Sequence, residues 1–315
     1  MSADAPPTLR EFEAARDALR DVIRATPLVP VGDDADRLLI KPETLQPAGS
    51  FKVRGVLWAV RAFSDAARAR GVSTVSAGNT AKALAWSARR FGVPARSVMP
   101  DHAPRTKIAA LERLGGVADL RPVDEVFRYL RERLWEGEPT AFVHPWTSRE
   151  VRVGHGSLGL EILDERPDVE TVYLPVGGGG LLGGVGAALR AKKPGIRIVA
   201  VEPAGCPALH ASLAAGRPTE VPCDTLCDGV AVPYITDEMF PRLAELVDDV
   251  VLVTEEEVAD AIRALVAEVH LVAEGAGALA FAAARRTPAE VRGLAVAPIT
   301  GGSIDRHVLQ RILAG

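Results

Sequence analysis

Apolar positions in the first fifty residues change from a helical to a strand-like spacing. In TLREFEAARDALRDVI, residues 8–23, apolar residues recur near the helical period, and Thr8 and Glu11 have the spacing of a capping box. After the ATPLVP turn, RLLIKPE is a short apolar run typical of a buried strand. The pattern predicts a helix followed by a strand.

The same alternation continues to the C-terminus. Helices are expected over residues 52–70 and 79–91, with VSTVS as a strand between them. Each further strand candidate precedes or follows a helical stretch: ARSVMP, GVADL, TAFVH, TVYLPV, IRIVAVE, DVVLVT and LAVAPI. Because strands that alternate with helices form parallel sheets covered on both faces, the predicted fold class is α/β, doubly wound.

Composition limits the class of protein and its partners. The 315 residues suggest one large or two medium domains, and 48% hydrophobic content is ample for a core. A net charge of −4 leaves no excess of positive charge to hold a nucleic acid. The N-terminus lacks a basic segment followed by an apolar one, and no apolar run approaches the roughly 18 residues of a membrane span. We therefore expect a cytoplasmic protein with no nucleic-acid or membrane partner.

Cysteine usage points to the same compartment. Cys206, Cys223 and Cys227 are an odd number in a long chain, which argues against a disulfide framework and favours a reducing environment. CDTLC with Asp228 and His210 is a weak candidate for half a metal site, because no second pair of soft ligands follows it.

Lys52, in GSFKVRG, allows two interpretations. The simpler one is a solvent-facing lysine that begins an amphipathic helix, VRGVLWAVRAF. In the other, apolar neighbours partly desolvate the amine and lower its pKa below the ordinary value of about 10.4. A neutral amine of this kind can form a Schiff base with an aldehyde cofactor.

The glycine-rich stretch TVYLPVGGGGLLGGVG also has two interpretations. A strand runs into four glycines and then a helix, so backbone N–H groups are arranged to hold a phosphate. Gly178, Gly180 and Gly183 fit the dinucleotide fingerprint G-x-G-x-x-G, with Glu202 as the acidic ribose ligand, 202 − 183 = 19 residues later. The stretch is therefore typical either of a nicotinamide-dependent dehydrogenase or of a site for a single terminal phosphate.

Taken together, the motifs of this chain resemble the threonine/serine dehydratase and serine racemase family. They are KPETLQPAGSFKVRG, SAGN, HPW followed by GHGSLGLEIL, PVGGGG, VEP, DGVAV, EGAGA and ITGGSID, and they extend from about Thr26 to Asp305. The resemblance implies a fold type II pyridoxal phosphate (PLP) enzyme with two doubly wound open-sheet domains and the cofactor in the cleft. Residues 1–44 and 149–315 would form the large PLP-binding domain, residues 45–148 the small domain, and two chains a homodimer.

The resemblance also implies roles for individual residues. Lys52 would hold PLP and act as the catalytic base that removes the Cα proton. The remaining cofactor contacts would come from Phe51 beside the ring, Asn79 at the 3-hydroxyl, Thr300 at the pyridine nitrogen, and Gly177, Gly178, Gly179 and Gly180 at the phosphate. Ser76, Ala77, Gly78, Asn79, Thr80 and Trp146 would surround the substrate. Asn79 could also serve as an ordinary helix N-cap, and the two roles are compatible.

Departures from the family pattern sharpen the predicted chemistry. Ala77 stands where racemases have a serine that supplies a proton, so racemisation is disfavoured. Thr80 and Lys82 replace the usual histidine and glutamine, which leaves the preferred substrate acid open. Glu202 resembles the first ligand of a divalent-cation site, but Ala208 stands where a second carboxylate is expected, so no metal is predicted.

Four further residues concern packing around the site. Trp146, Val230 and Val232 are either core residues or the wall of an apolar pocket that prefers a methyl or aryl group on Cβ. His155 stands where the family has glutamine and is expected to be packed or solvent-facing.

The predicted function is a PLP-dependent hydroxy-amino-acid dehydratase. Its substrate would be L-threonine, L-serine or a bulkier apolar analogue such as L-threo-3-phenylserine, and its products a 2-oxo acid and ammonia. The alternatives are an amino acid racemase of the same family, an NAD-dependent dehydrogenase, and a catalytically silent relative that binds small molecules.

Overall fold

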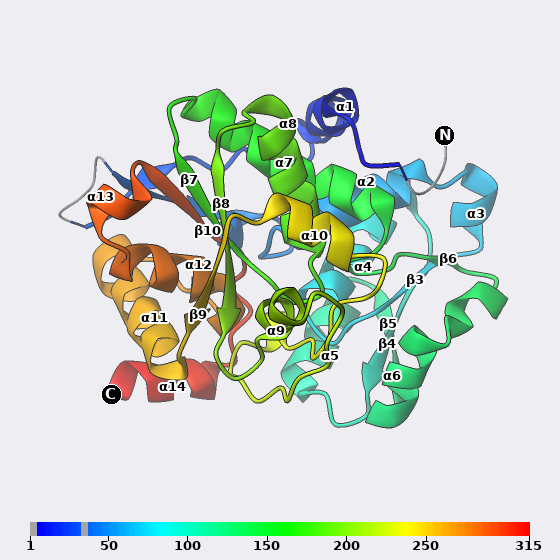
Figure 1. The fold of residues 1–315 in the computed structure, drawn as a ribbon. Helices are drawn as coiled ribbons and strands as arrows, with labels where there is room; N and C mark the ends of the chain where they lie inside the picture. The colour runs from blue at the N-terminus through cyan, green and yellow to red at the C-terminus, as the bar shows by residue number, and fades with distance from the viewer. Residues whose placement is uncertain (1–4, 33–36) are drawn as a thin grey trace.

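The chain forms two open sheets, each wrapped in helices, in a computed structural model that describes residues 5–32 and 37–315 (Figure 1). The first residues of the predicted large domain, 1–4, lie outside the described residues. Both sheets consist of parallel strands apart from one antiparallel pair, β1 with β2. The predicted α/β, doubly wound class is confirmed.

The larger sheet is built from both ends of the described sequence. Its strands lie in the order β1 (Val29–Pro30), β2 (Leu38–Pro42), β10 (Ala295–Ile299), β7 (Thr171–Pro175), β8 (Arg197–Pro203) and β9 (Asp249–Val253). The four central strands are almost wholly buried, which explains why they read as continuous apolar runs in the sequence.

The smaller sheet uses only the middle of the chain. Its strands lie in the order β5 (Gly116–Arg121), β4 (Ala95–Pro100), β3 (Val72–Val75) and β6 (Ala141–Phe142). A boundary of the small domain at residues 45 and 148 is compatible with this arrangement and stays our proposal.

Each sheet has one point where the strand order reverses. In the larger sheet, the chain moves outward from β7 to β8 and β9, and later returns on the other side of β7 with β10. In the smaller sheet it moves from β3 to β4 and β5, and returns beside β3 with β6. Loops at the carboxyl ends of strands on either side of such a point diverge and leave a crevice where ligands bind.

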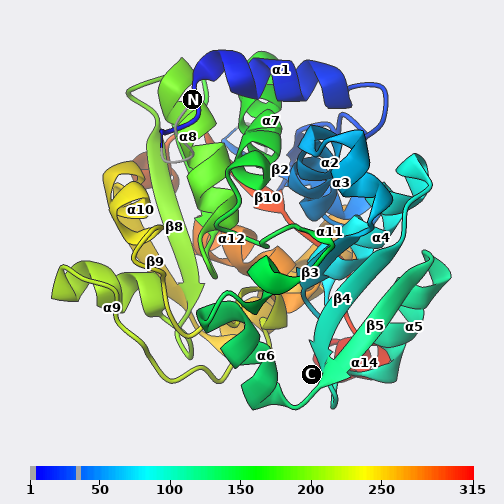
Figure 2. The ribbon, with the colours of Figure 1, turned by 90° about the vertical axis from the view of Figure 1, so that its right-hand side faces the viewer.

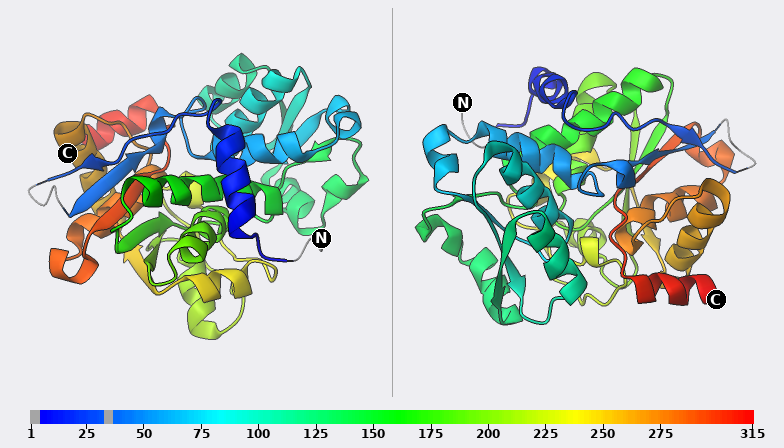
Figure 3. Two further views of the ribbon diagram at one scale, coloured as in Figure 1. Left: turned by 90° about the horizontal axis from the view of Figure 1, so that it is seen from above. Right: turned by 180° about the vertical axis from the view of Figure 1, so that it is seen from behind.

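Helices cover both faces of the larger sheet. One face packs against α11 (Glu255–Val269) and α12 (Gly275–Arg286), with α14 (Arg306–Ala314) beside α11 (Figure 3). The other face packs against α7 (Arg149–Glu165), α8 (Ala187–Lys192), α9 (Ala208–Ala215) and α10 (Phe240–Leu246), and α1 (Leu9–Leu19) lies outside α7. The short helix α13 (Ala289–Arg292) precedes β10.

The smaller sheet is covered in the same way. The helices α2 (Lys52–Ala62), α4 (Asn79–Phe91) and α5 (Arg105–Arg113) pack together on one face, and α6 (Val123–Arg131) packs on the other (Figure 2). Short 3₁₀ turns occur at Glu43–Leu45, Leu134–Gly137 and Asp228–Val230, and a π turn at Leu182–Gly186 precedes α8. Within the described ranges, none of the helices combines the length and apolar character that crossing a membrane requires.

Most predicted elements are present, with one break that was missed. The capping box is confirmed, because the Thr8 hydroxyl accepts from the Glu11 N–H and the Glu11 carboxylate accepts from the Thr8 N–H. The single helix predicted over residues 52–70 is wrong. It is divided into α2 and α3 (Asp65–Ala69), because Phe63 is extended and the Ser64 hydroxyl caps a new helix at the Ala67 N–H.

The expectation of no disulfide is also wrong. Cys206 and Cys223 form a disulfide, with Cα atoms 4.3 Å apart. The backbone brings them together, since the Asp224 N–H donates to the Gly205 carbonyl at 3.0 Å. The odd cysteine is Cys227, which is buried and free. Cys223 is therefore not half of a metal site, and the reducing compartment loses its support from the cysteines.

Candidate active site

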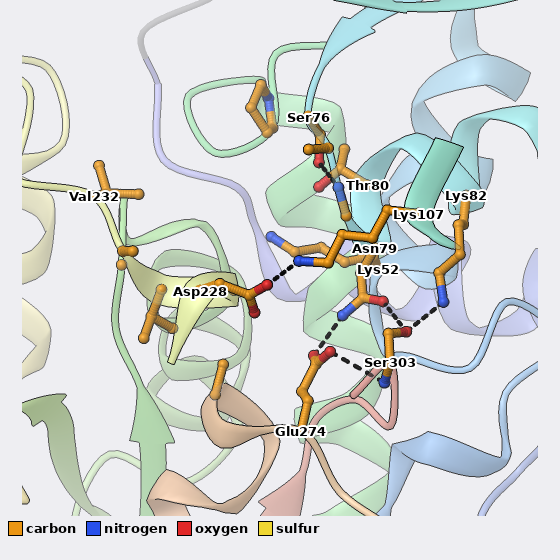
Figure 4. A pocket seen from close by; sticks show the side chains of 18 of the residues that line it. Lys52, Ser76, Asn79, Thr80, Lys82, Lys107, Asp228, Val232, Glu274 and Ser303 are labelled. Carbon is orange, nitrogen blue, oxygen red and sulfur yellow. Dashed lines mark hydrogen bonds and ion pairs between the residues drawn. The ribbon is translucent and has the colours of Figure 1, made fainter. Parts of the chain in front are cut away.

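A cavity of about 560 Å³ lies between the two sheets and is lined from both (Figure 4). The loop after β7 and the strand end of β10 contribute Gly177–Gly180 and Thr300, and the turn after β3 contributes residues 76–80. The two points of reversed strand order thus face the same space. Every residue predicted to bind the cofactor or substrate lines this cavity.

Lys52 is the first residue of α2 and faces the cavity. The preceding backbone is tied to the end of β10, because the Phe51 N–H donates to the Thr300 carbonyl at 3.0 Å. Burial lowers the pKa of Lys52 to about 8, although the nearby Glu274 carboxylate raises it. The solvent-facing interpretation of Lys52 is therefore wrong, and the desolvated-amine interpretation agrees with the structure.

A buried ion cluster fixes the helix that carries Lys52. The guanidinium of Arg54, with 0% exposure, donates to both oxygens of Glu43 at 2.7 and 2.8 Å and to both oxygens of Glu161 at 2.6 and 2.8 Å. Glu161 also pairs with Lys41 at 3.1 Å. These contacts join the start of α2 to β2 and α7, so they set the position of Lys52. Arg54 was not predicted as a residue of the site.

The glycine loop is shaped by close packing. A Cβ at Gly178 would lie 2.4 Å from Cδ2 of Trp146, and one at Gly180 would lie 2.9 Å from Cα of Trp146. Gly179 has φ +87°, which favours glycine, and its Cβ would lie 2.4 Å from Cδ1 of Leu243. In the described part of the chain, the N–H groups of residues 177–179 have no protein acceptor. The loop thus presents free donors suited to a phosphate.

The 76–79 turn presents the N-terminus of a helix to the cavity. Gly78 is the N-cap of α4 and makes no side-chain cap, and the first turn of α4 contains no acidic residue. The Ser76 hydroxyl accepts from the Gly78 N–H at 3.0 Å, and Thr80 is buried. Asn79 is the first helical residue, so the plain N-cap interpretation of Asn79 is wrong. The positive end of the helix dipole is available to a carboxylate.

Glu274 is a central residue of the site that the sequence analysis missed. It accepts from the Asn79 side-chain amide at 2.5 Å and from the Ser303 N–H at 3.1 Å (Figure 4). Burial raises its pKa to about 7, and Asp228 adds to this rise. The available signal was a single carboxylate in the otherwise apolar stretch VAEGAGALAF, which was quoted as a motif but given no role.

The remaining residues that line the cavity are of two kinds. The apolar side chains among them, which we call the apolar wall, are Val75, Val98, Val126, Trp146 and Val232. Charged side chains also line the cavity, namely Lys82, Lys107, Arg113 and Asp228, and Lys107 forms an ion pair with Asp228 (Figure 4). Val230 both lines the cavity and belongs to the core, so the two interpretations of this residue are compatible.

Three predicted positions have specific surroundings. Lys52 Nζ lies 5.0 Å from the centre of the Phe51 ring. The Thr300 hydroxyl donates to the Ala276 carbonyl at 3.3 Å and borders the cavity. His155 is fully buried: its Nδ1 accepts from the Gly55 N–H at 3.1 Å, and its ring centre lies 4.7 Å from that of Phe51. The packed alternative for His155 is confirmed.

Glu202 fits neither of the ligand roles considered for it. Its two carboxylate oxygens accept from the Leu209 and His210 N–H groups at 2.7 and 2.8 Å, at the start of α9. It is fully buried, so it is not placed to bind a ribose, and burial raises its pKa to about 7. Among residues 5–32 and 37–315, no cluster of three His, Cys, Asp or Glu side chains is arranged to hold a metal.

Comparison with known proteins identifies the family. Residues 19–301 match the family described as "Pyridoxal-phosphate dependent enzyme". The chain is 39% identical over 314 residues to an L-threonine ammonia-lyase of Thermotoga maritima, covering 97% of this chain and 78% of that protein. It is 40% identical over 302 residues to an L-threonine ammonia-lyase of Geobacter sulfurreducens, covering 93% and 75%.

Solved structures of similar proteins have the same fold. Maize serine racemase superposes with a TM-score of 0.90 at 30% identity, covering 98% of each chain. The processed form of threonine deaminase isoform 2 from Solanum lycopersicum superposes with a TM-score of 0.87 at 30% identity, covering 100% of this chain and 97% of that one.

Proposed function

Because the chain belongs to the pyridoxal-phosphate dependent enzyme family, we propose that it is an ammonia-lyase that converts a β-hydroxy-α-amino acid, first of all L-threonine, to a 2-oxo acid and ammonia. The observation that carries the proposal is Lys52. This amine, with a pKa of about 8, shares one cavity with a glycine loop on one side and a helix N-terminus on the other. The family excludes the NAD-dependent dehydrogenase alternative.

The residues present fit pyridoxal phosphate. Gly177–Gly180 would hold the phosphate through backbone N–H groups that no side chain obstructs. Phe51 would pack beside the ring, Thr300 would face the pyridine nitrogen, and Asn79 would face the 3-hydroxyl. When bound, the cofactor supplies an electron sink for the breaking Cα–H bond.

Lys52 would hold the cofactor and remove the Cα proton of the substrate. A pKa of about 8 keeps an appreciable neutral fraction near pH 7, because burial makes the charged form costly. The β-hydroxyl would then leave as water, with a proton that Nζ of Lys52 can return, and hydrolysis of the resulting enamine would give the 2-oxo acid and ammonia. The proton taken from Cα would be held at Nζ of Lys52.

The substrate carboxylate would bind at the N-terminus of α4. Ser76, Gly78, Asn79 and Thr80 offer hydroxyl and backbone N–H donors there, and the helix dipole favours an anion. Ala77 is in the same turn and has no proton to give. This turn therefore binds the substrate without supplying an acid to Cα.

The apolar wall supports a preference for an apolar substituent on Cβ. Val75, Val98, Val126, Trp146 and Val232 face the cavity without a charged side chain among them. Burial of a methyl group there would make the binding free energy more favourable by roughly 0.8 kcal/mol per carbon. We propose that L-threonine is preferred over L-serine and that L-threo-3-phenylserine is accepted.

The test is the visible absorption spectrum of the purified protein with each of these three amino acids, together with 2-oxo acid release. A yellow, borohydride-reducible chromophore and 2-oxobutanoate from L-threonine are expected. Lys52→Ala should abolish both, whereas Lys192→Ala, a lysine of α8 paired with Asp164, should keep both. A chromophore in Lys52→Ala equal to that of the parent would refute the role of Lys52.

The side-chain preference has its own test. Trp146→Ser places a small polar group in the apolar wall and should raise the ratio of L-serine to L-threonine turnover. Equal turnover of serine and threonine by the parent, with no activity on 3-phenylserine, would contradict the apolar-pocket proposal and leave the lyase proposal intact.

Racemisation remains a second candidate because of the similarity to maize serine racemase. Ala77 argues against it, and chiral analysis of serine after incubation decides the matter. The homodimer and the cytoplasmic location are also proposals. Mass measurement in solution and cell fractionation test them.

A further inference from the structure

Four polar residues form a directional chain of hydrogen bonds across the cleft. Lys82 Nζ donates to Ser303 Oγ, Ser303 Oγ donates to Asn79 Oδ1 at 2.6 Å, and Asn79 Nδ2 donates to Glu274 Oε1 at 2.5 Å (Figure 4). The Ser303 N–H also donates to Glu274 Oε2, at 3.1 Å. We call these four residues the Asn79 relay.

The two ends of the relay determine its direction. An ammonium group has donors only, so Ser303 Oγ must accept from Lys82 and its single proton goes to Asn79 Oδ1. At the other end, an ionised carboxylate has acceptors only, so it takes an N–H of Asn79. Turning the Asn79 amide over would place its carbonyl oxygen against the Glu274 carboxylate. The amide therefore has one orientation while Glu274 is ionised, above its pKa of about 7.

The relay joins the two sides of the cleft. Asn79 and Lys82 lie one turn apart on α4, while Glu274 precedes α12 and Ser303 follows β10. Gly301 lies next to the contact between Asn79 and Glu274. A Cβ at Gly301 would lie 2.3 Å from Glu274 Oε1 and 2.8 Å from Asn79 Nδ2. The close approach of Asn79 and Glu274 thus depends on how the two halves of the site meet.

We propose that Lys82 is a positioning residue: through Ser303 it fixes the Asn79 amide so that its second N–H points into the cavity, toward the 3-oxygen of the cofactor. This inference rests on the cofactor role proposed for Asn79. Nδ2 has two N–H groups, and Glu274 takes one of them. The ammonium of Lys82 can only donate, whereas a side chain with both donor and acceptor atoms, such as glutamine, would leave the direction of the relay open.

The charges around the relay support this role. Burial lowers the pKa of Lys82, while Glu274 raises it, and Lys107 and Arg113 lower it. Glu274 is faced by Asp228 from the turn after Cys227, by Lys82 from α4, by Lys107 from α5 and by Lys52 from α2. Removing the Lys82 charge favours protonated Glu274, whose O–H can donate to Asn79 Oδ1 and turn the amide over.

The test is a double-mutant cycle on the holoenzyme with Lys82→Met, Ser303→Ala and the double variant. The readouts are the cofactor dissociation constant, the visible absorbance of the bound cofactor as a function of pH, and kcat and KM for L-threonine. Each single variant should weaken cofactor binding about tenfold, the effect of losing one hydrogen bond with a charged partner. The pH midpoint of the change in cofactor absorbance should shift. The factor by which kcat falls should exceed the factor by which KM rises.

The double-mutant cycle distinguishes a relay through Asn79 from independent effects of Lys82 and Ser303 on cofactor binding. Because both residues act through Asn79, the double variant should be no worse than either single variant. Additive losses, or unchanged affinity and spectrum in Lys82→Met, would overturn the inference. Arg113→Met, which removes an exposed cation of the same cavity outside the relay, should leave the pH midpoint of the absorbance change closer to that of the parent than Lys82→Met does.

Asn79→Ala distinguishes failure of this inference from failure of the proposed site. If Asn79→Ala changes the cofactor spectrum and Lys82→Met does not, Asn79 contacts the cofactor and only the relay is wrong. If neither variant changes it, the proposed role of Asn79 is wrong as well.

Discussion

Two strand-to-helix turns line the same cavity and present backbone N–H groups in different ways. The glycine loop after β7 is held by packing, with Trp146, Val230 and Leu243 against its Cα atoms. The turn after β3 has open space at Gly78 and is held by hydrogen bonds, including those of Asn79 to Ser303 and Glu274. One turn is fixed by shape and the other by polar partners.

The two turns should therefore respond differently to changes in pH. The glycine loop has no titratable side chain, so its geometry should not depend on pH. The 76–79 turn depends on Glu274, a carboxylate about 195 residues away in sequence, and on Lys82. We infer that the phosphate end of the site is rigid, while the end that meets the substrate and the 3-oxygen is adjustable by charge.

The largest effect is expected from a methyl group added to the glycine loop. Gly179→Ala combines a φ of +87° with a Cβ 2.4 Å from Cδ1 of Leu243, and should cost about 2 to 4 kcal/mol of unfolding free energy. Gly78→Ala, with nothing within 4 Å of its Cβ, should cost less than about 1 kcal/mol. Denaturant unfolding measures both, and similar losses would remove the distinction between the turns.

An intermediate effect is expected from titration of Glu274. Its pKa is about 7 in the folded protein, against an ordinary value of 4.5, because burial favours the neutral acid. Between these pH values the folded protein holds a proton that the unfolded chain has released. Stability should therefore fall as pH rises through this window, by roughly 3 kcal/mol at most, and then level off.

Glu274→Gln should remove this part of the pH dependence. Burial also raises the pKa of Glu202 to about 7, so Glu202 should keep its own contribution to the pH dependence of stability. The slope of stability against pH should therefore become smaller without reaching zero. The bound cofactor should also lose a spectral transition near pH 7 in Glu274→Gln. An unchanged stability profile and an unchanged spectral transition would show that the 76–79 turn is as insensitive to charge as the glycine loop.

The smallest effect is expected from Ala77→Ser, which adds a hydroxyl to the adjustable turn. If Ala77 limits racemisation for lack of a proton donor, the variant should form D-serine from L-serine about 10 to 100 times faster than the parent. Chiral chromatography measures this, with 2-oxo acid release as the reference rate. No D-serine from the variant would mean that a hydroxyl at this position does not act on Cα.

Much of the fold could be predicted from local sequence patterns. The capping box of α1 and the buried apolar strands of both sheets need only neighbouring residues to be recognised. The break at Phe63 was missed because a helical period continues across it, and only the Ser64 cap reveals a new start. The disulfide was missed because counting cysteines gives no information about which ones the backbone brings together.

The sequence by itself determined the family and the α/β class and singled out Lys52 as the candidate cofactor lysine, because these depend on residue types at short, ordered spacings. Tertiary structure decided the environment of each group. It lowered the pKa of Lys52, placed Arg54 between Glu43 and Glu161, and joined Asn79 to Glu274. These effects come from burial and from contacts between residues far apart in the chain, and local spacing contains no record of either.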